Sequence, residues 1–531
     1  MPSCPRTPRW TFALVSAGGV VMTLDVTVVN VALSDIARDL DTGLGRVQWT
    51  VSAYSLAFGA LLLTAGALSD RLGRRAVFTA GMALFTLASA GCGLAPDAGT
   101  LIAARAAQGV GGALVFAPTL ALLAAAYEGA RRQAAIAAFA AIASAAGALG
   151  PVVGGVFVQV LGWRWIFLVN VPIGVLVVAG ALARMPESAA PAPARRRLDP
   201  LGAALGVAAL LALHYPLVTG PEAGWTAPQV LGSAVLGVLL SAALVASQRR
   251  GGGLIDMALL RVRAFSGAAV LGFLARMSSL GVLAFTTLWL QSAHGLSALG
   301  VGLYLLPLTG SLLVAGLFVA RLQRMVTPDV LVAAGFALQG LGLLALAAAA
   351  GAHAGQAVTV AGLVLLGAGG AVIFPPLMGV AVGAVPAERA GMASGLTNSC
   401  YPLGTAAGVA VFGALFSARL EAGLGAGFAA GPTSGPQGPV PVRTAVETGR
   451  FELLEPALRP LARSAFSGAF STVCLASALV CLLGVFVART LRAEARTVGG
   501  GGGGRPVGGG PGGRVHSSEI GRSGGGGGVW Y

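Results

Sequence analysis

Long apolar stretches separated by short polar connections make up most of the chain. A helix that crosses a membrane needs about 20 mostly apolar residues, because the helix rises 1.5 Å per residue and the hydrocarbon layer is about 30 Å thick. By this measure the pattern predicts an all-α membrane protein with fourteen transmembrane helices. The predicted spans are residues 11–33, 47–68, 76–95, 100–126, 133–159, 165–183, 200–219, 228–247, 264–290, 298–320, 328–350, 356–384, 391–418 and 465–488.

Composition agrees with a membrane protein and excludes other classes. Of the 531 residues, 56% are hydrophobic and only 10% are charged, whereas a soluble globular domain carries about 25% charged residues. The apolar content is also too high for a disordered chain. The five cysteines show no CxxC spacing, so the sequence predicts neither a disulfide framework nor a metal site, and it indicates no cofactor.

The arginines predict the orientation in the membrane. All 34 basic residues are arginine, and they lie mainly between the apolar stretches, so the net charge of +15 does not indicate nucleic acid as a partner. In the fourteen-span arrangement, 24 arginines fall on the side of the termini and 8 on the opposite side, with Arg105 and Arg276 inside spans. Because basic residues are enriched on the cytoplasmic side, we expect a plasma-membrane protein with both termini in the cytoplasm.

An internal repeat divides the chain into two related parts. Three segments of the first part recur in the second at offsets of 250, 258 and 254 residues. They are Gly66–Arg75 with Gly316–Met325, Gly109–Pro118 with Gly367–Pro376, and Gly150 and Gly154 with Gly404 and Gly408. Parallel repeats of this kind are typical of secondary transporters, in which the substrate path lies between the halves.

The repeat predicts the domain organisation. We expect a six-helix half over residues 1–190, two extra helices over 191–260, and a second six-helix half over 261–490. Residues 419–463 are predicted to form an external loop within the second half. Residues 491–531 are rich in glycine and are predicted to form a disordered cytoplasmic tail.

Five motifs in the first half resemble those of a known family. They are Leu24–Leu33, Gly66–Arg75, Arg105–Ala113, Gly147–Gly155 and Trp163–Gly174. The sequence over residues 10–490 resembles the fourteen-span drug:proton antiporters of the major facilitator superfamily. Within that family it is similar to antibiotic exporters of the methylenomycin resistance type, partly through Gly220–Trp225. The resemblance implies the major facilitator fold and proton-coupled efflux.

Asp25 and Arg105 are the candidates for proton coupling. Asp25 is the only acidic residue placed inside a predicted span, where a carboxylate must face water or a partner, or stay protonated. A structural hydrogen bond between helices is the alternative role. The resemblance implies that the arginine at the position of Arg105 takes part in proton transfer. Asn30 and Gln108, in the same two spans, are candidates for the lining of the substrate cavity.

The connection between the second and third spans is a candidate gate. Positive charge alone would anchor it on the cytoplasmic side, but anchoring requires neither Asp70 nor Gly73. The resemblance implies that this connection closes the cytoplasmic side through a charge network, so Asp70, Arg71, Gly73 and Arg74 are assigned to gating. Arg75 is interpreted as a membrane anchor.

Small residues in the fifth span form a candidate antiporter motif. Gly147, Gly150, Pro151, Gly154 and Gly155 lie at spacings that let helix backbones approach closely, and proline bends a helix. Glycine is common in membrane helices, so a purely structural role is the alternative. The resemblance implies that this motif marks antiporters, and we expect it to close the interface between the halves.

Arg276 is a third candidate for the cavity. Its offset from Asp25 is 251 residues, within the range of the repeat. The two residues are therefore expected at equivalent positions on the first helix of each half, opposite one another in the cavity. The alternative is a break at Gly267 or Gly272 that moves Arg276 toward the cytoplasm.

The function predicted from the sequence is export of a small, largely apolar drug or antibiotic in exchange for protons. Uptake of a small solute and a non-transporting receptor are the alternatives. A Walker motif is absent, since the chain contains no lysine, and no hydrolase motif is found, so the protein is not predicted to be an enzyme. The expected partners are the drug, protons and the lipid bilayer, and we expect a monomer.

Overall fold

The computed structural model describes residues 7–187, 199–250, 259–351, 355–385, 390–428, 445–446, 451 and 454–491. Its described part is helical and contains no strand. The helices are α1 Thr7–Asp39, α2 Leu44–Leu72, α3 Arg74–Gly93, α4 Ala98–Ala126, α5 Gly129–Leu161, α6 Trp165–Leu168, α7 Asn170–Arg184, α8 Pro200–Ala223, α9 Pro228–Arg249, α10 Arg263–His294, α11 Ala298–Tyr304, α12 Leu306–Met325, α13 Pro328–Gly351, α14 Gln356–Gly383, α15 Ala390–Phe428 and α17 Arg459–Ala488.

The helices agree with the predicted fourteen spans. Thirteen segments among the described residues are long and apolar enough to cross a membrane, with α6 and α7 forming one span and α11 and α12 another. The remaining predicted span corresponds to α5, which has 33 residues and contains a shorter apolar segment, Leu149–Leu161. The all-α fold class is therefore confirmed.

Several helices run further than the hydropathy pattern indicated. α1 continues to Asp39, so Asp35 and Asp39 lie in the same helix as Asp25, near its C-terminal end. Both acids lie beyond the predicted span 11–33, so Asp25 remains the only acid within that span, and the helix is longer than the span because a helix can extend through the headgroup layer beyond the hydrocarbon. α15 likewise reaches Phe428, and α17 begins at Arg459, both inside the stretch 419–463.

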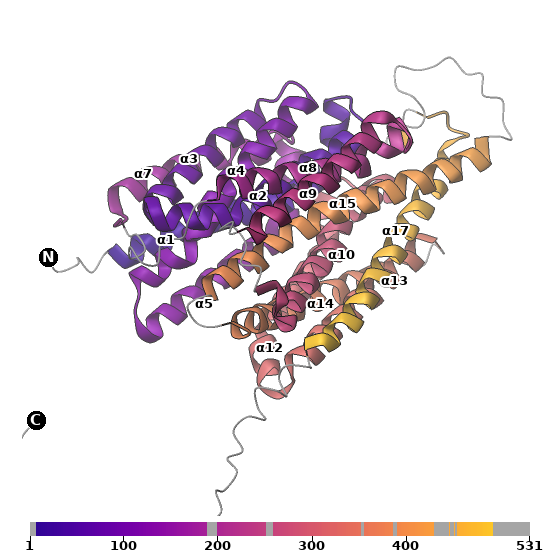
Figure 1. Cartoon of the computed structure of the whole chain (residues 1–531). Helices are drawn as coiled ribbons and strands as arrows, with labels where there is room; N and C mark the ends of the chain where they lie inside the picture. Colours follow the sequence, from indigo (N-terminus) through magenta and orange to yellow (C-terminus); the bar gives the residue numbers. More distant parts are fainter. Residues whose placement is uncertain are drawn as a thin grey trace, which may run out of the picture.

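Two groups of helices form the bundle. Figure 1 shows α1–α7, the N-terminal half, in indigo and purple, and α10–α17, the C-terminal half, in pink, orange and yellow. Glycines let helices cross closely within each half. A Cβ atom added to Gly81 of α3 would lie 2.6 Å from Leu114 Cβ of α4, and one added to Gly342 of α13 would lie 2.6 Å from the carbonyl oxygen of Gly362 in α14.

The halves meet at their predicted external ends through α1 and α10. Thr287 Oγ1 donates to the carbonyl oxygen of Asn30 at 2.8 Å, and Gln291 Nε2 donates to that of Val31 at 2.9 Å. Ser34 Oγ also donates to Gln291 Oε1, at 2.5 Å. These contacts hold the two first helices of the repeat against one another.

The extra helices lie outside the six-helix halves. α8 packs against α2 and α15, one helix from each half, and Figure 1 shows α8 and α9 alongside them. His214 of α8 makes an edge-to-face contact with Trp49 of α2, at 4.8 Å between ring centres. Most of α9 is exposed. The extra helices therefore cover the α2–α15 contact without entering the bundle interior.

Candidate functional site

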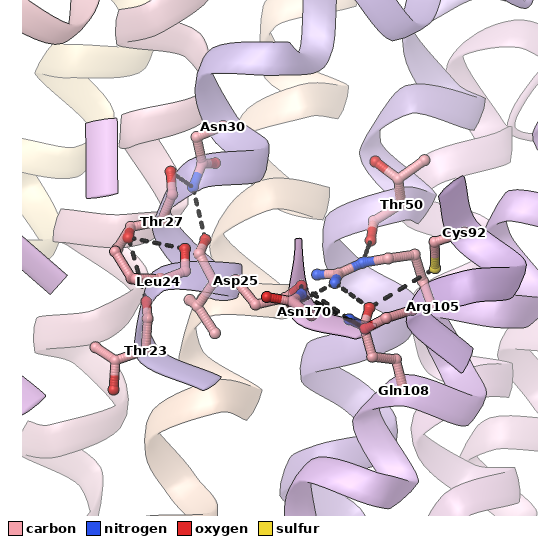
Figure 2. Close-up of polar contacts among 12 residues, drawn as sticks. Thr23, Leu24, Asp25, Thr27, Asn30, Thr50, Cys92, Arg105, Gln108 and Asn170 are labelled. Atoms are coloured by element: carbon pink, nitrogen blue, oxygen red, sulfur yellow. Dashed lines mark hydrogen bonds and ion pairs between the residues drawn. The ribbon is translucent and has the colours of Figure 1, made fainter. Parts of the chain in front are cut away.

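Asp25 of α1 and Arg105 of α4 form a buried ion pair inside the N-terminal half. Arg105 Nη1 donates to Asp25 Oδ2 at 2.5 Å, and each side chain is 1% exposed. Figure 2 shows the two side chains pointing toward one another from separate helices. The sequence-predicted partners are thus brought together, in a setting where neither charge has access to bulk water.

Gln108 and Asn170 complete the surroundings of the carboxylate. Gln108 Nε2 donates to Asp25 Oδ1 at 2.8 Å, and Gln108 Oε1 accepts from Arg105 Nη1 at 2.6 Å. Asn170 Nδ2, at the start of α7, lies 3.3 Å from Asp25 Oδ1. Ser89 Oγ of α3 accepts from Gln108 Nε2 at 2.7 Å. Gln108 therefore belongs to the buried network around the ion pair.

The guanidinium of Arg105 is held on its other sides by α2 and α6. Arg105 Nε donates to the carbonyl oxygen of Thr50 at 2.9 Å. Its carbon Cζ lies 4.4 Å from the ring centre of Tyr54 and 5.6 Å from that of Phe167. Gly109 permits this approach, because a Cβ there would lie 2.4 Å from the carbonyl oxygen of Tyr54. A buried charge surrounded in this way depends strongly on its one counterion.

A cavity of about 220 Å³ reaches the ion pair between α1, α5 and the α6–α7 span. Its wall is mostly apolar, with Val20 and Leu24 on α1 and Phe157 on α5, and Asp25 and Asn170 are its polar residues. The network therefore lies at the border of a space large enough for several water molecules.

Asn30 lies one and a half turns beyond Asp25, at the contact between the halves. Its Nδ2 donates to the carbonyl oxygen of Val26 at 3.0 Å, and its own carbonyl oxygen accepts from Thr287 of α10. The side-chain Oδ1 is buried and has no hydrogen-bond partner in the described structure. Asn30 thus places a side-chain acceptor without a partner among the described residues at the contact between the halves.

The candidate gate at the α2–α3 connection contains a sharp turn. Gly73 has φ +106° and ends α2 directly before α3 begins, a conformation that residues with a side chain rarely adopt. Asp70 Oδ1 and Arg74 Nη2 form an ion pair at 3.7 Å. Arg71 is exposed, and its side chain makes no ion pair or hydrogen bond with described residues.

Glu187 joins this connection to the end of α7. Its two carboxylate oxygens accept from the backbone N–H groups of Arg75 at 3.0 Å and Ala76 at 3.2 Å, so Glu187 caps the N-terminus of α3. Arg75 Nε lies 3.6 Å from the same carboxylate, and Arg75 Nη1 donates to the carbonyl oxygen of Met185 at 3.0 Å. Arg75, interpreted from sequence as an anchor, is thus part of a tertiary contact.

The residues of the α5 motif face two different neighbours. Cβ atoms added to Gly147, Gly150 and Gly154 would meet Thr23, Thr27 and Val28 of α1, all in the same half. A Cβ on Gly155 would instead lie 2.6 Å from the carbonyl oxygen of Ala298 in α11, and the carbonyl oxygen of Pro151 would lie 2.5 Å from a Cβ on Gly302. Only Pro151 and Gly155 therefore line the interface between the halves in this arrangement.

Arg276 lies in the C-terminal half, in contact with α14 and α15. α10 is unbroken from Arg263 to His294, so the alternative of a break at Gly267 or Gly272 does not apply. The Cζ atom lies 4.3 Å from the ring centre of Phe374 and 5.9 Å from that of Tyr401. The ion pair of Asp25 is formed with Arg105, and within the described part of the chain no hydrogen bond or ion pair joins Asp25 to Arg276.

The sequence model of the Major Facilitator Superfamily matches residues 15–409. The chain belongs to the major facilitator superfamily. This confirms the resemblance drawn from the motifs. Solved structures agree at the level of the fold: a bacterial homologue of the human lysosomal transporter Spinster, in an inward-facing and unoccupied conformation, superposes with a TM-score of 0.63 at 15% identity, covering 93% of this chain and 99% of that one.

Relatives within the superfamily carry names of resistance and export proteins. The multidrug resistance protein Stp of Mycobacterium tuberculosis is 37% identical over 412 residues, which cover 77% of this chain and 76% of that protein. The methylenomycin A resistance protein of Streptomyces coelicolor is 36% identical, covering 75% and 84%. The tetracenomycin C resistance and export protein of Streptomyces glaucescens is 34% identical, covering 76% and 75%.

Sequence reasoning did not assign several residues of these sites. Asn170 and Ser89 are polar residues inside apolar spans, and that pattern could have marked them as neighbours of the ion pair. Glu187 follows the end of a span and gave no such signal. Among the described residues, no group of three or more His, Cys, Asp or Glu side chains is arranged to hold a metal ion.

Proposed function

We propose that this protein exports a small organic drug or antibiotic across the cell membrane in exchange for protons. The observation that carries the proposal is the buried Asp25–Arg105 ion pair beside a cavity. Relatives that match about three quarters of the chain are named as drug-resistance and export proteins. These names support a drug or antibiotic as the exported compound.

The ion pair has the properties that proton coupling requires. A proton on Asp25 removes the charge that balances Arg105, and an unbalanced buried guanidinium is costly. The network then rearranges, since Gln108 and Asn170 bond to the same carboxylate. Loss of the proton restores the ion pair. Asp25 thereby gives α1 two arrangements, one for each protonation state.

α1 transmits this change to the interface between the halves. Beyond Asp25, the same helix bonds to α10 through Asn30, Val31 and Ser34, and on its side it packs against the glycines of α5. A shift of α1 therefore alters the contacts that hold the external ends together. The α2–α3 connection, with Asp70, Arg71, Gly73 and Arg74, is proposed to gate the opposite, cytoplasmic end.

The orientation follows from the arginine distribution. With both termini in the cytoplasm, the α1–α10 contacts lie on the external side and the α2–α3 connection on the cytoplasmic side. The two halves of a single chain enclose the substrate path, so the proposal requires only a monomer and no enzymatic step.

Direction of transport separates export from the alternative of uptake. Susceptibility profiling of a drug-sensitive host that expresses the protein would first identify a cargo. Everted membrane vesicles energised to be acidic inside should then accumulate that compound, and an uncoupler should release it. Accumulation only in right-side-out vesicles would favour uptake, and no accumulation in either would contradict transport of that compound.

A further inference from the structure

Arg276 places a positive charge deep within the C-terminal half. It lies thirteen residues from the start of α10 at Arg263 and eighteen from its end at His294, or about 20 Å and 27 Å along the helix at 1.5 Å per residue. The residue is only partly exposed. At that depth its side chain cannot reach either end of the helix.

Helices near Arg276 supply no acid to balance it. α10 and α14 contain no acidic residue, and the only acid of α15 is Glu421, twenty residues along the helix from Tyr401, or about 30 Å. Arg105, the other arginine inside a span, has Asp25 as its counterion. The guanidinium of Arg276 is therefore a cation without a nearby acidic counterion on its own helix or on α14 and α15, the two helices that contact it.

Two aromatic rings flank the guanidinium. The ring of Phe374 from α14 lies 4.3 Å from Cζ, and that of Tyr401 from α15 lies at 5.9 Å. The two rings contact each other edge to face, with 5.0 Å between their centres. Contacts of this kind stabilise a cation but leave its N–H donors available. We name these three residues the aromatic–arginine site.

The hydroxyl of Tyr401 adds an unpaired polar group. It is buried and has no hydrogen-bond partner in the described structure. The ring is placed there by Gly272, one turn before Arg276, because a Cβ on Gly272 would lie 2.2 Å from Tyr401 Cε1. The absence of a side chain at Gly272 thus allows the ring of Tyr401, with its unpaired hydroxyl, to lie next to Arg276.

The aromatic–arginine site borders the interface between the halves. Pro402 and Leu403, the next residues of α15, lie within 3.0 Å of the position of a Cβ on Gly59 of α2. Tyr401 is therefore one residue along the chain from a contact with the N-terminal half. In transporters of this architecture the substrate path lies between the two halves.

We propose that the aromatic–arginine site binds the carboxylate of an aromatic organic acid, which makes such anions a substrate class of the transporter. The Arg276 guanidinium supplies charge-assisted hydrogen bonds to the carboxylate, the Tyr401 hydroxyl supplies another donor, and Phe374 offers apolar surface to the ring of the acid. Transport of these anions rests on the proposed export function, whereas their binding to the site does not.

Binding of three matched probes tests the site directly. Full-length protein in phosphatidylcholine nanodiscs would be titrated with 1-naphthoate, neutral 1-naphthamide and cationic 1-naphthylmethylammonium, which share a ring system and differ in charge. We expect naphthoate to bind on the order of tenfold or more tightly than naphthamide, the usual effect of a charge-assisted hydrogen bond, and the cation to bind most weakly.

Substitutions assign the preference to the proposed residues. Arg276→Gln should abolish the preference for naphthoate over naphthamide, whereas Arg263→Gln, the same change at an exposed position of α10, should leave it intact. Phe374→Leu keeps the charge, so it should weaken all three probes while preserving their order. Because Phe374→Leu removes no buried charge, it still tests the site if Arg276→Gln fails to fold.

Three results would overturn the proposal: equal binding of the three probes, a preference for naphthoate that survives Arg276→Gln, or unchanged affinities in Phe374→Leu. Nanodiscs that contain phosphatidylglycerol distinguish a second source of anion. If they remove the preference, a lipid phosphate occupies the site, and the assignment to an organic acid is wrong. These titrations need no proton gradient, so failure of the export function alone would leave their outcome unchanged.

Discussion

Gly150 of α5 lies against Thr27 of α1 so closely that a Cβ on Gly150 would fall 1.8 Å from Thr27 Oγ1. No side chain fits at that distance without displacing one of the two helices. α1 carries Asp25, so the separation of α1 and α5 also determines where the ion pair lies relative to the cavity between them.

Gly150→Ala should therefore move α1 away from α5 and impair transport. The expected cost of overpacking is about 1–3 kcal/mol, which should appear as a lower thermal unfolding midpoint of the purified protein. Gly468→Ala on α17 is the matched control, because a Cβ there would meet nothing within 4 Å. Equal behaviour of the two variants would show that the close approach of α1 and α5 is dispensable.

Gly73→Ala should be the most damaging change in the α2–α3 connection. Its φ of +106° is unfavourable for alanine, and a Cβ there would also lie 2.6 Å from Glu187 Oε1, the cap of α3. Arg75→Ala removes a half-exposed ion pair worth about 0–1 kcal/mol and should cause a smaller loss. Gly66→Ala on α2 is the control, because a Cβ there would meet nothing within 4 Å, and it should resemble wild type in vesicle transport assays. The ranking is refuted if Gly66→Ala is as harmful as Gly73→Ala.

The Ser34–Gln291 contact should open during the transport cycle. In a protein with its five native cysteines replaced, Ser34→Cys and Gln291→Cys should be joined by a short bifunctional thiol reagent, because their wild-type side chains are in hydrogen-bond contact. Transport should stop on cross-linking and return when a cleavable linker is reduced. Full transport by the cross-linked protein would mean that this contact is static.

The sequence anticipated the parts of the protein that depend on hydrophobic length and on charge inside a span. The fourteen apolar stretches predicted the membrane-spanning helices. An acid and an arginine in apolar surroundings predicted the Asp25–Arg105 pair, since charges inside a span usually pair with one another. The ends of α1 and α15 were missed because helices continue into polar layers, where hydropathy carries no information.

Side-chain direction limited the prediction of the remaining site residues. Spacing along α5 grouped Pro151 and Gly155 with Gly147, whereas the structure turns Gly147 toward α1 and the other two toward α11. The repeat predicted that Arg276 lies at the position equivalent to Asp25. It did not predict the aromatic contacts of Arg276 with α14 and α15, because these contacts depend on tertiary packing.

The central claim is that protonation of Asp25 couples proton movement to drug export, and proteoliposomes test it most directly. Wild-type protein and Asp25→Asn would be reconstituted with a pH-sensitive dye inside and supplied with the compound identified by susceptibility profiling. The account predicts that a gradient of the compound drives protons in the opposite direction through wild-type protein. Asp25→Asn, which cannot exchange a proton, should show no coupled proton flux while still equilibrating the compound across the membrane. Proton flux at the wild-type rate in Asp25→Asn would contradict the account.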